Sequence, residues 1–355
     1  MLANITPHFT QNKENPPMRS DSTPLIEIQN LHVAFPTDDG TVNAVQDVSF
    51  TIPRGGTVGL VGESGCGKSM TGLALLQLIA KPGRVQGGSI LYHGATPNSP
   101  VVDIAKLNPR GDEIRAIRGK QIAMIFQEPM SSLNPVYTIG QQIMEAVFLH
   151  EKMNKKEARN RAIEMLKKVG IPAPEQRVDE FPHQLSGGMR QRAMIAMALA
   201  CNPVMRIADE PTTALDVTVQ AQILDLMRQL QEELGMAILM ISHDLGVIAD
   251  LSEQIVVMYA GRVVEYGTAE EVFYTAQHPY TQGLLRSAPV MGTRTQERLY
   301  SIPGTVPNPL AMPKGCAFRP RCPERFQKCL EMPALLPVGN AQLARCWARQ
   351  EPTTP

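Results

Sequence analysis

A glycine-rich turn at residues 62–69 sets the strongest limit on the fold of this chain. Its spacing, Gly62-x-x-x-x-Gly67-Lys68-Ser69, is that of a phosphate-binding loop, which has this meaning only between a strand and a helix. The chain supplies both, because the apolar run "TVGLVG" precedes the turn and "MTGLALLQLI", with helical spacing, follows it. The sequence therefore predicts an α/β fold with a phosphate site; the alternative is a glycine turn that binds nothing.

The turn also carries the chemical groups that phosphate binding needs. Its glycines let backbone N–H groups point at phosphate oxygens, at the positive end of the following helix. Lys68 offers a positive charge to the β and γ phosphates, and the hydroxyl of Ser69 suits Mg²⁺.

Three further apolar runs, at residues 121–126, 204–210 and 236–242, are predicted to be strands that end in polar side chains. Ligands of an open parallel sheet bind beyond the carboxyl ends of its strands, so these side chains are expected at the edge that holds the turn. They are Gln127, the adjacent carboxylates Asp209 and Glu210, and His243. Taken singly, Gln127 is also compatible with a surface amide and His243 with a capping or solvent-exposed histidine.

A helical stretch, roughly residues 140–200, separates the second of these strands from the third, and it contains "LSGGMRQR". Ser186, Gly187 and Gly188 open a helix there, which makes a second anion-binding helix start. It cannot reach the phosphate of the first loop if it lies across a separate subdomain. A phosphate-facing site without a nucleotide of its own suggests a partner.

Composition narrows the class of protein. Of 355 residues, 43% are apolar, which is enough for the core of one large domain or two ordinary ones. Thirty-four basic side chains balance thirty-four acidic ones, so we expect no nucleic-acid partner. No stretch approaches eighteen uninterrupted apolar residues, and residues 1–23 resemble a disordered tail and not a signal peptide. We therefore expect a globular protein that neither spans a membrane nor leaves the cytoplasm by a signal peptide.

At this point the chain resembles the ATP-binding subunits of ABC transporters. The family's motifs occur in the family's order: "GESGCGKS" (Walker A), "FQEP" (Q-loop), "LSGGMRQR" (signature), "IADE" (Walker B), "TALD" (D-loop) and "SHD" (H-loop). The resemblance implies a P-loop NTPase with a RecA-like parallel sheet core, an antiparallel β subdomain and a helical signature subdomain at about residues 130–200. It also implies an ATPase domain at 24–275 and a small cysteine-rich extension at 276–355.

The resemblance implies residue roles in ATP hydrolysis with Mg²⁺. Glu210 is expected to orient and polarise the attacking water, while His243 holds the γ-phosphate and Gln127 senses phosphate and metal. The expected magnesium residues are Ser69, Gln127 and Asp209. Asp216 would link two sites across a dimer, and Phe35 would stack on adenine unless it is a core aromatic. The full expected nucleotide-binding set is Phe35, Gly62, Ser64, Gly65, Cys66, Gly67, Lys68, Ser69, Gln127, Asp209, Ser186, Gly187, Gly188 and Asp216.

Past residue 255 the chain resembles the C-terminal extension of dipeptide and oligopeptide importer ATPases. This implies a second ABC ATPase, which the subfamily suggests is a paralogue, two membrane permease subunits and, indirectly, an extracytoplasmic solute-binding protein. The chain would sit at the cytoplasmic face of the inner membrane and power peptide import. Nickel chelates, glutathione or short sugars are alternative cargoes, and an ABC ATPase that acts on ribosomes or DNA is the rival class.

Three residues on the ATPase domain attract separate expectations. Arg206 interrupts the Walker B strand, where a doubly covered strand favours an apolar residue, and is expected to snorkel or to pair locally. Cys66 is either an oxidisable thiol activated by the helix start or merely a small residue. Cys201 is expected in the core.

Four cysteines cluster in the last forty residues, with the spacing C-x₅-C-x₆-C-x₁₆-C. In a reducing compartment structural disulfides are not expected, so these thiols are metal ligands or free. The segment lacks the close cysteine pairs of zinc knuckles, and the same extension in similar importer subunits implies a [4Fe–4S] cluster. We therefore predict iron–sulfur ligands at Cys316, Cys322, Cys329 and Cys346, with Zn²⁺ as the alternative.

Overall fold

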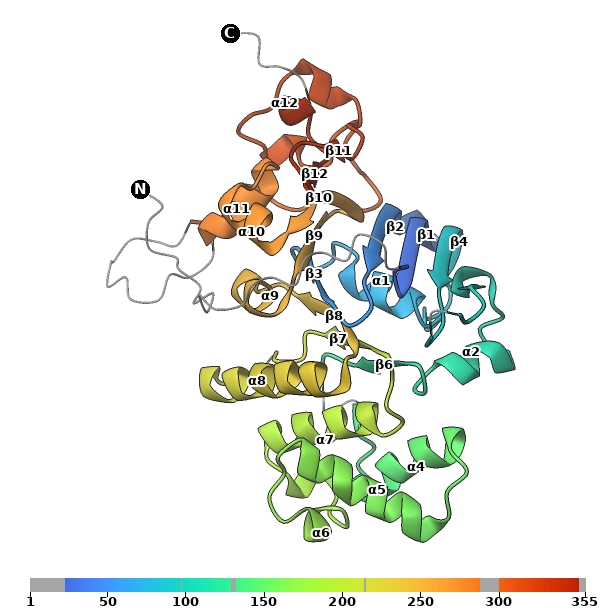
Figure 1. Cartoon of the computed structure of the whole chain (residues 1–355). Helices are drawn as coiled ribbons and strands as arrows, with labels where there is room; N and C mark the ends of the chain where they lie inside the picture. Colours follow the sequence, from blue (N-terminus) through green and yellow to red (C-terminus); the bar gives the residue numbers. More distant parts are fainter. Residues whose placement is uncertain (1–22, 97, 129–131, 214, 288–299, 351–355) are drawn as a thin grey trace.

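The computed structural model describes residues 23–350, apart from residues 97, 129–131, 214 and 288–299. Nearly all of the predicted N-terminal tail therefore lies outside the described residues. Figure 1 shows a central sheet with an antiparallel sheet on one side, a helical layer below β6 and α8, and a C-terminal part at the opposite end. No helix in the described ranges has the length and apolar character needed to cross a membrane.

The central sheet has eight strands in the order β11-β12-β10-β9-β3-β8-β7-β6. Five neighbours pair in parallel and form its core: β3 (Thr57–Val61), β6 (Ile122–Ile125), β7 (Met205–Asp209), β8 (Ala237–Ser242) and β9 (Gln254–Tyr259). Strands β3, β7 and β8 are buried along their whole length, as near-continuous apolar runs require. The predicted parallel sheet is confirmed.

The second sheet is antiparallel, in the order β2-β1-β4-β5. Its strands are β1 (Ile26–Thr37), β2 (Gly40–Ile52), β4 (Arg84–Tyr92) and β5 (Val102–Asp103). Inward-facing residues of this sheet share one apolar core with α1 (Lys68–Ala74) and one face of the central sheet. The short helices η1 (Ile104–Lys106) and α2 (Asp112–Ile117) lead from β5 to β6.

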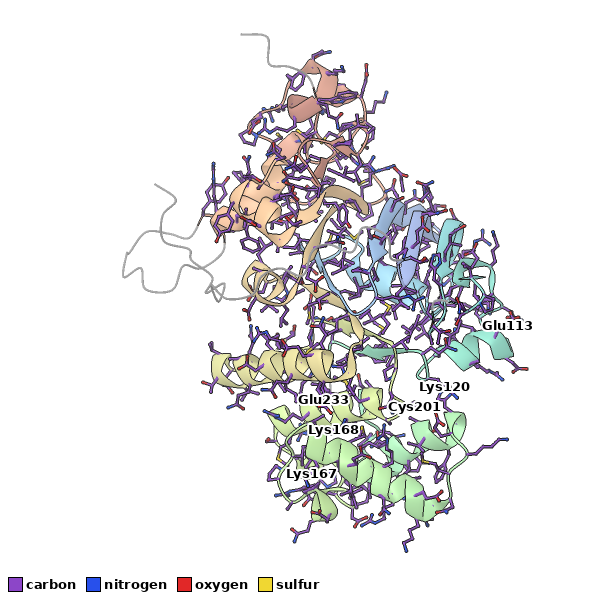
Figure 2. The ribbon with its side chains drawn as sticks, in the orientation of Figure 1. Glu113, Lys120, Lys167, Lys168, Cys201 and Glu233 are labelled. Atoms are coloured by element: carbon purple, nitrogen blue, oxygen red, sulfur yellow. The ribbon has the colours of Figure 1, made fainter. Side chains whose placement is uncertain are left out.

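The helical layer follows β6, where the sequence predicts helices. It comprises α4 (Ile139–His150), α5 (Lys155–Lys168), α6 (Pro174–Arg177), η2 (Pro182–Gln184) and α7 (Gly187–Leu199). Capping boxes at Thr138 and Asn154 start α4 and α5. Next to this layer lies α8 (Val217–Leu234), and Lys168 of α5 pairs with Glu233 of α8 at 2.8 Å (Figure 2). Helix α9 (Leu245–Leu251) packs on β3 and β8.

The C-terminal part is joined to the central sheet by β10 (Arg262–Thr268), which pairs antiparallel with β9 and β12. Its other elements are α10 (Ala269–Tyr274), α11 (Pro279–Ser287), η3 (Arg319–Arg321), η4 (Gln327–Leu330), β11 (Leu336–Pro337), β12 (Leu343–Ala344) and α12 (Trp347–Gln350). Glu265 of β10 is fully buried and accepts hydrogen bonds from the backbone N–H groups of Gln277 and His278 and from the Gln342 amide. This carboxylate therefore fastens the C-terminal part to the sheet.

Arg206 corrects one expectation from the sequence. Its side chain has no exposed surface, and its Nη2 lies 3.3 Å from Sδ of Met236. Nε and Nη1 have no hydrogen-bond partner among the described residues. The expectation that Arg206 snorkels is wrong, because the strand is covered on both faces and holds the guanidinium inside. Of the alternative, local pairing, the structure shows only the contact with the sulfur of Met236. Burial lowers the pKa of Arg206 to about 10.

Cys201 follows α7 and is buried, and its Sγ donates to the carbonyl of Ala146 at 3.4 Å. Figure 2 labels it at the boundary of the helical layer. The prediction that this cysteine belongs to the core is confirmed by its burial.

Candidate functional site

The glycine-rich turn leaves β3 and enters α1, and two of its glycines are required by close packing. A Cβ on Gly62 would lie 2.2 Å from the carbonyl oxygen of Met258, and a Cβ on Gly67 would lie 2.3 Å from that of Ala44. Gly67 also has a φ of 101°, which favours glycine. The two ends of the loop are thus held against the backbone of neighbouring strands.

Lys68 and Ser69 connect this loop to the end of β7. Lys68 is buried, and its Nζ donates to the carbonyl oxygens of Gly62 at 2.7 Å and Glu63 at 3.2 Å. The hydroxyl of Ser69 donates to Oδ1 of Asp209 at 3.0 Å. A charged amine, a hydroxyl and a carboxylate therefore meet at one edge of the sheet, which is a donor set for a phosphate with Mg²⁺.

Asp209 is the last residue of β7 and is buried. Burial raises the pKa of its carboxyl, and the charge of Glu210 adds to this, while the bond from Ser69 and the charge of Lys68 oppose it. A bound cation would remove the cost of this buried carboxylate.

Glu210 is the meeting point of the other side chains predicted from strand ends. Its Oε2 lies 3.0 Å from Nε2 of Gln127 and 3.2 Å from Nδ1 of His243. Its backbone φ is 45°, so the chain turns here and Glu210 faces partners different from those of Asp209. The structure thus brings together the three residues proposed for hydrolysis.

Thr213 joins this group and was missed in the sequence. Its hydroxyl donates to Oε2 of Glu210 at 3.0 Å. The signal available was its position three residues after Glu210 in a turn, where a threonine hydroxyl commonly bonds a nearby side chain or backbone group.

The signature residues lie elsewhere. Ser186 caps α7, and its Oγ accepts from the N–H of Met189, while Gly187 has open space around its Cα. Figure 1 places α7 in the helical layer, on the far side of β7 and β8 from α1. A Cβ on Gly188 would lie 2.9 Å from Val219, so the signature packs against the start of α8.

Asp216 caps that same helix start, and its Oδ1 accepts from the N–H groups of Thr218 and Val219. The residue expected to link two sites therefore lies beside the signature and holds the first turn of α8.

Phe35 and Cys66 both pack against neighbouring residues in the structure. Phe35 lies in β1, half-buried, with its ring on Gly83 and the core beneath the antiparallel sheet. Cys66 is buried, and burial raises the pKa of its thiol. Of the two interpretations of Cys66, the small residue that fills the loop fits and the activated thiol does not.

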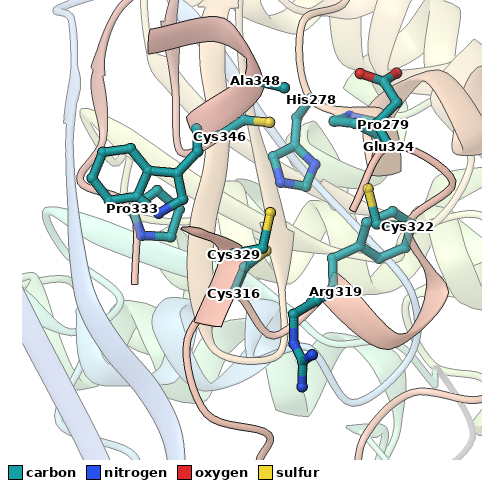
Figure 3. Close-up of a pocket in the computed structure, with 12 residues that line it drawn as sticks. His278, Pro279, Cys316, Arg319, Cys322, Glu324, Cys329, Pro333, Cys346 and Ala348 are labelled. Carbon is teal, nitrogen blue, oxygen red and sulfur yellow. The ribbon is translucent and has the colours of Figure 1, made fainter. Parts of the chain in front are cut away.

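All four C-terminal cysteines line one pocket, which Figure 3 shows with their sulfur atoms around a common space. The cavity between them is small, about 10 Å³. Burial raises the pKa of Cys316, and raises that of Cys322 and Cys346 to about 11. Yet no three His, Cys, Asp or Glu side chains in the described part of the chain are grouped so that they could hold one metal ion. The prediction of a metal at these cysteines stays a prediction.

Comparison with known sequences agrees with this geometry. The sequence model of the ABC transporter family matches residues 45–213, and that of the oligopeptide/dipeptide transporter C-terminal region matches residues 264–329. The oligopeptide transport ATP-binding protein OppD of Haemophilus influenzae is 48% identical over 328 residues, which cover 92% of this chain and 98% of that protein. The dipeptide transport ATP-binding protein DppD of Escherichia coli K12 is 47% identical over 323 residues, covering 91% and 96%.

Solved structures give the same result for the fold. The dimeric ATP-binding cassette MJ0796, in a post-hydrolysis state with ADP and Pi, superposes with a TM-score of 0.60 at 28% identity, covering 69% of this chain and 98% of its own. CbiO1 of Clostridium perfringens gives 0.58 at 27% identity, covering 72% and 93%. The fold and the site define an ATP-binding cassette ATPase. The chain belongs to the ABC transporter family and carries the C-terminal region of its oligopeptide and dipeptide transporters.

Proposed function

We propose that this chain hydrolyses ATP to power the import of dipeptides or oligopeptides across the cytoplasmic membrane. The observation that carries the proposal is the convergence on Glu210 of Gln127 and His243, next to the contact of Ser69 with Asp209. Phosphoryl transfer requires positioned charges and a positioned water more than covalent chemistry, and this edge of the sheet supplies both.

In the proposed mechanism, Lys68 exchanges its bonds to the loop carbonyls for the β and γ phosphates of ATP. Ser69, Asp209 and Gln127 would hold Mg²⁺, directly or through its water shell, and the metal would neutralise charge on the phosphates. Phe35 would stack on adenine, and Ser64, Gly65 and Cys66 would complete the cradle of the loop. Glu210 would accept a hydrogen bond from the attacking water, with His243 next to the γ-phosphate.

The site is completed by a second chain in this proposal. Ser186, Gly187 and Gly188 open α7, which Figure 1 shows on the far side of β7 and β8 from α1, so they would face a nucleotide that a partner holds. The dimeric form of the related cassette MJ0796 supports this arrangement. Asp216, beside the signature, would carry contacts between the two sites. Closure of such a dimer assembles the site, which couples hydrolysis to motion.

The cargo and the partners are proposed from the relatives. Both bacterial relatives are peptide transport proteins by name, and the C-terminal region is that of the same transporters. We propose a paralogous ATPase as partner, two permease subunits in the membrane and an extracytoplasmic binding protein, with this chain peripheral at the cytoplasmic face. Nickel chelates, glutathione or short sugars are the alternative cargoes.

The cysteine pocket is proposed to hold a [4Fe–4S] cluster, with Zn²⁺ as the alternative. Four thiols around one space fit four-cysteine ligation. Metal binding would deprotonate the thiols and stabilise the cysteine-rich segment, which has few apolar residues to form a core of its own. Anaerobically purified protein should then carry about four irons per chain and absorb near 400 nm, as this cluster type requires. One stoichiometric zinc in a colourless protein would contradict the cluster.

The test of the ATPase proposal is Glu210→Gln in the assembled transporter. Mg-ATP binding should be retained, because Lys68 and Ser69 are untouched, while steady-state hydrolysis should fall by roughly a hundredfold or more. Glu113→Gln, which changes an exposed carboxylate on α2, is the matched control and should leave turnover unchanged. Normal turnover in Glu210→Gln would exclude Glu210 as the base.

A further inference from the structure

The phosphate loop is joined to the C-terminal part of the chain by a bidentate ion pair. The carboxylate of Glu63 accepts from Nη1 of Arg321 at 2.7 Å and from Nη2 at 3.0 Å. The Arg321 side chain is 4% exposed and that of Glu63 27%. The two residues are 258 positions apart, and Glu63 directly follows Gly62 at the start of the loop. Paired and mostly buried, this contact differs from a screened surface salt bridge.

Arg321 is itself fixed from several sides. Its Nε donates to the carbonyl of Pro303 at 3.0 Å and its Nη2 to that of Ile302 at 3.2 Å. The guanidinium carbon lies 5.8 Å from the ring centre of Tyr259 and 5.9 Å from that of Phe318. A planar fork held in this way presents its donors to Glu63 in one orientation.

A second contact reaches the same residue of the loop. The backbone N–H of Glu63 donates to the hydroxyl of Tyr280 at 2.8 Å. The Tyr280 side chain is fully buried, with ring centres of Tyr259 and Phe318 at 4.6 and 5.4 Å. Both the backbone and the side chain of Glu63 are thus held by aromatic and basic groups from outside the loop.

These contacts act where the loop has little other support. Gly62 and Gly67 pack against neighbouring backbone, but Ser64 and Gly65 are exposed and a Cβ on Gly65 would meet nothing within 4 Å. The carbonyl of Glu63 also accepts from Nζ of Lys68. The position of Glu63 therefore decides where the open half of the loop lies and which oxygens face Lys68.

We propose that Arg321 is a positioning residue for the nucleotide, which acts through Glu63 to hold the phosphate loop in its binding shape. Tyr280 contributes through its hydrogen bond to the backbone of Glu63. This inference rests on the proposed function of the loop as the ATP site. Arg321 touches no nucleotide in this mechanism. It preorganises backbone N–H groups, so that less ordering is required when phosphates bind.

The test measures the dissociation constant of Mg-ATP for the full-length chain by calorimetry, at a temperature where circular dichroism shows every variant folded. Arg321→Met should weaken binding about fivefold or more, a typical coupling between two sites. Arg321→Lys should recover part of the loss, because it keeps the charge but not the fork. Arg325→Met, an exposed arginine of the same segment, is the matched control and should bind as the parent chain does.

Glu63→Gln and the double variant identify the route. If Arg321 acts through Glu63, Glu63→Gln alone should weaken binding, and Glu63→Gln with Arg321→Met should be no worse than Arg321→Met alone. Glu63→Gln keeps the shape of the side chain, so it carries the test if Arg321→Met does not fold.

Two results would overturn the inference: parent-like affinity in these variants, or losses from Glu63 and Arg321 that simply add. Either result leaves the proposed ATPase intact. Failure of the parent chain to bind Mg-ATP would instead overturn the proposed function.

Discussion

Replacing Arg206 by methionine is expected to stabilise the folded chain. The guanidinium has no exposed surface, and two of its nitrogens lack partners within the described residues. Burial lowers its pKa from the ordinary value of arginine to about 10, which corresponds to about 3 kcal/mol of unfavourable free energy for the charged form. Methionine has a similar length, joins Met236 in an apolar site and avoids that cost. For a chain of this size, about 3 kcal/mol corresponds to a rise in melting temperature of about 4 °C.

The pH dependence gives the same prediction a second measurement. Because the pKa of Arg206 is lower in the folded state than in the unfolded state, the unfolded chain binds more protons between about pH 10 and 12.5. As pH rises through that window, Arg206 loses its buried charge and the free energy of unfolding of the parent chain increases. The advantage of Arg206→Met is therefore complete at pH 7 to 8 and shrinks above about pH 10.

The assay is thermal unfolding of the full-length chain, followed by circular dichroism. The matched control is Arg84→Met on β4, where the arginine is exposed and its removal should change the melting temperature little. A melting temperature that is unchanged or lower in Arg206→Met, with Arg84→Met neutral, would refute the reasoning. Arg206 would then have a favourable interaction that outweighs its burial.

Three further outcomes are expected. Thr213→Val should lower the rate of ATP hydrolysis about tenfold and leave the affinity for Mg-ATP unchanged, because Glu210 loses a hydrogen bond to its carboxylate. Thr213→Ser should retain the rate, and an equal loss of Mg-ATP affinity in Thr213→Val would contradict this role. Cys322→Ser should weaken Mg-ATP binding in the parent chain, because the turn that carries Arg321 ends at Cys322. The same change should have no further effect in Arg321→Met, and calorimetry that shows equal effects in both backgrounds would exclude this coupling. Native mass spectrometry of the assembled transporter should find this chain once beside a different ATPase, and two copies of it would contradict the paralogous partner.

Local sequence signals were sufficient for much of the site. The phosphate loop is recognisable because its glycines, lysine and serine act within one strand–turn–helix unit. Gln127, Glu210 and His243 could be expected together because parallel strands deliver their carboxyl ends to one edge. In the structure all three residues meet there.

Other features depend on contacts that no local pattern encodes. Arg321 and Glu63 are far apart in the chain, and neither lies in a periodic run that would mark its partner. The sequence shows that Arg206 lies in an apolar strand, but not whether its side chain reaches solvent. The same local sequence is compatible with an arginine that extends to the surface and with one enclosed in the core. Tertiary packing decided both cases.

The two phosphate-facing elements of this chain have different supports, and this has a consequence for a complex with a paralogue. The loop at Glu63 is held by Arg321 and Tyr280 of the same chain, whereas the signature at Gly188 packs on Val219 at the start of α8, which Asp216 caps. In the proposed dimer, one nucleotide would meet this chain's loop and the other its signature. Changes at Arg321 would then act on the first nucleotide and changes at Asp216 on the second. Two paralogous ATPases would therefore have two chemically distinct ATP sites even if every catalytic residue were shared, because each site combines the loop contacts of one chain with the signature contacts of the other.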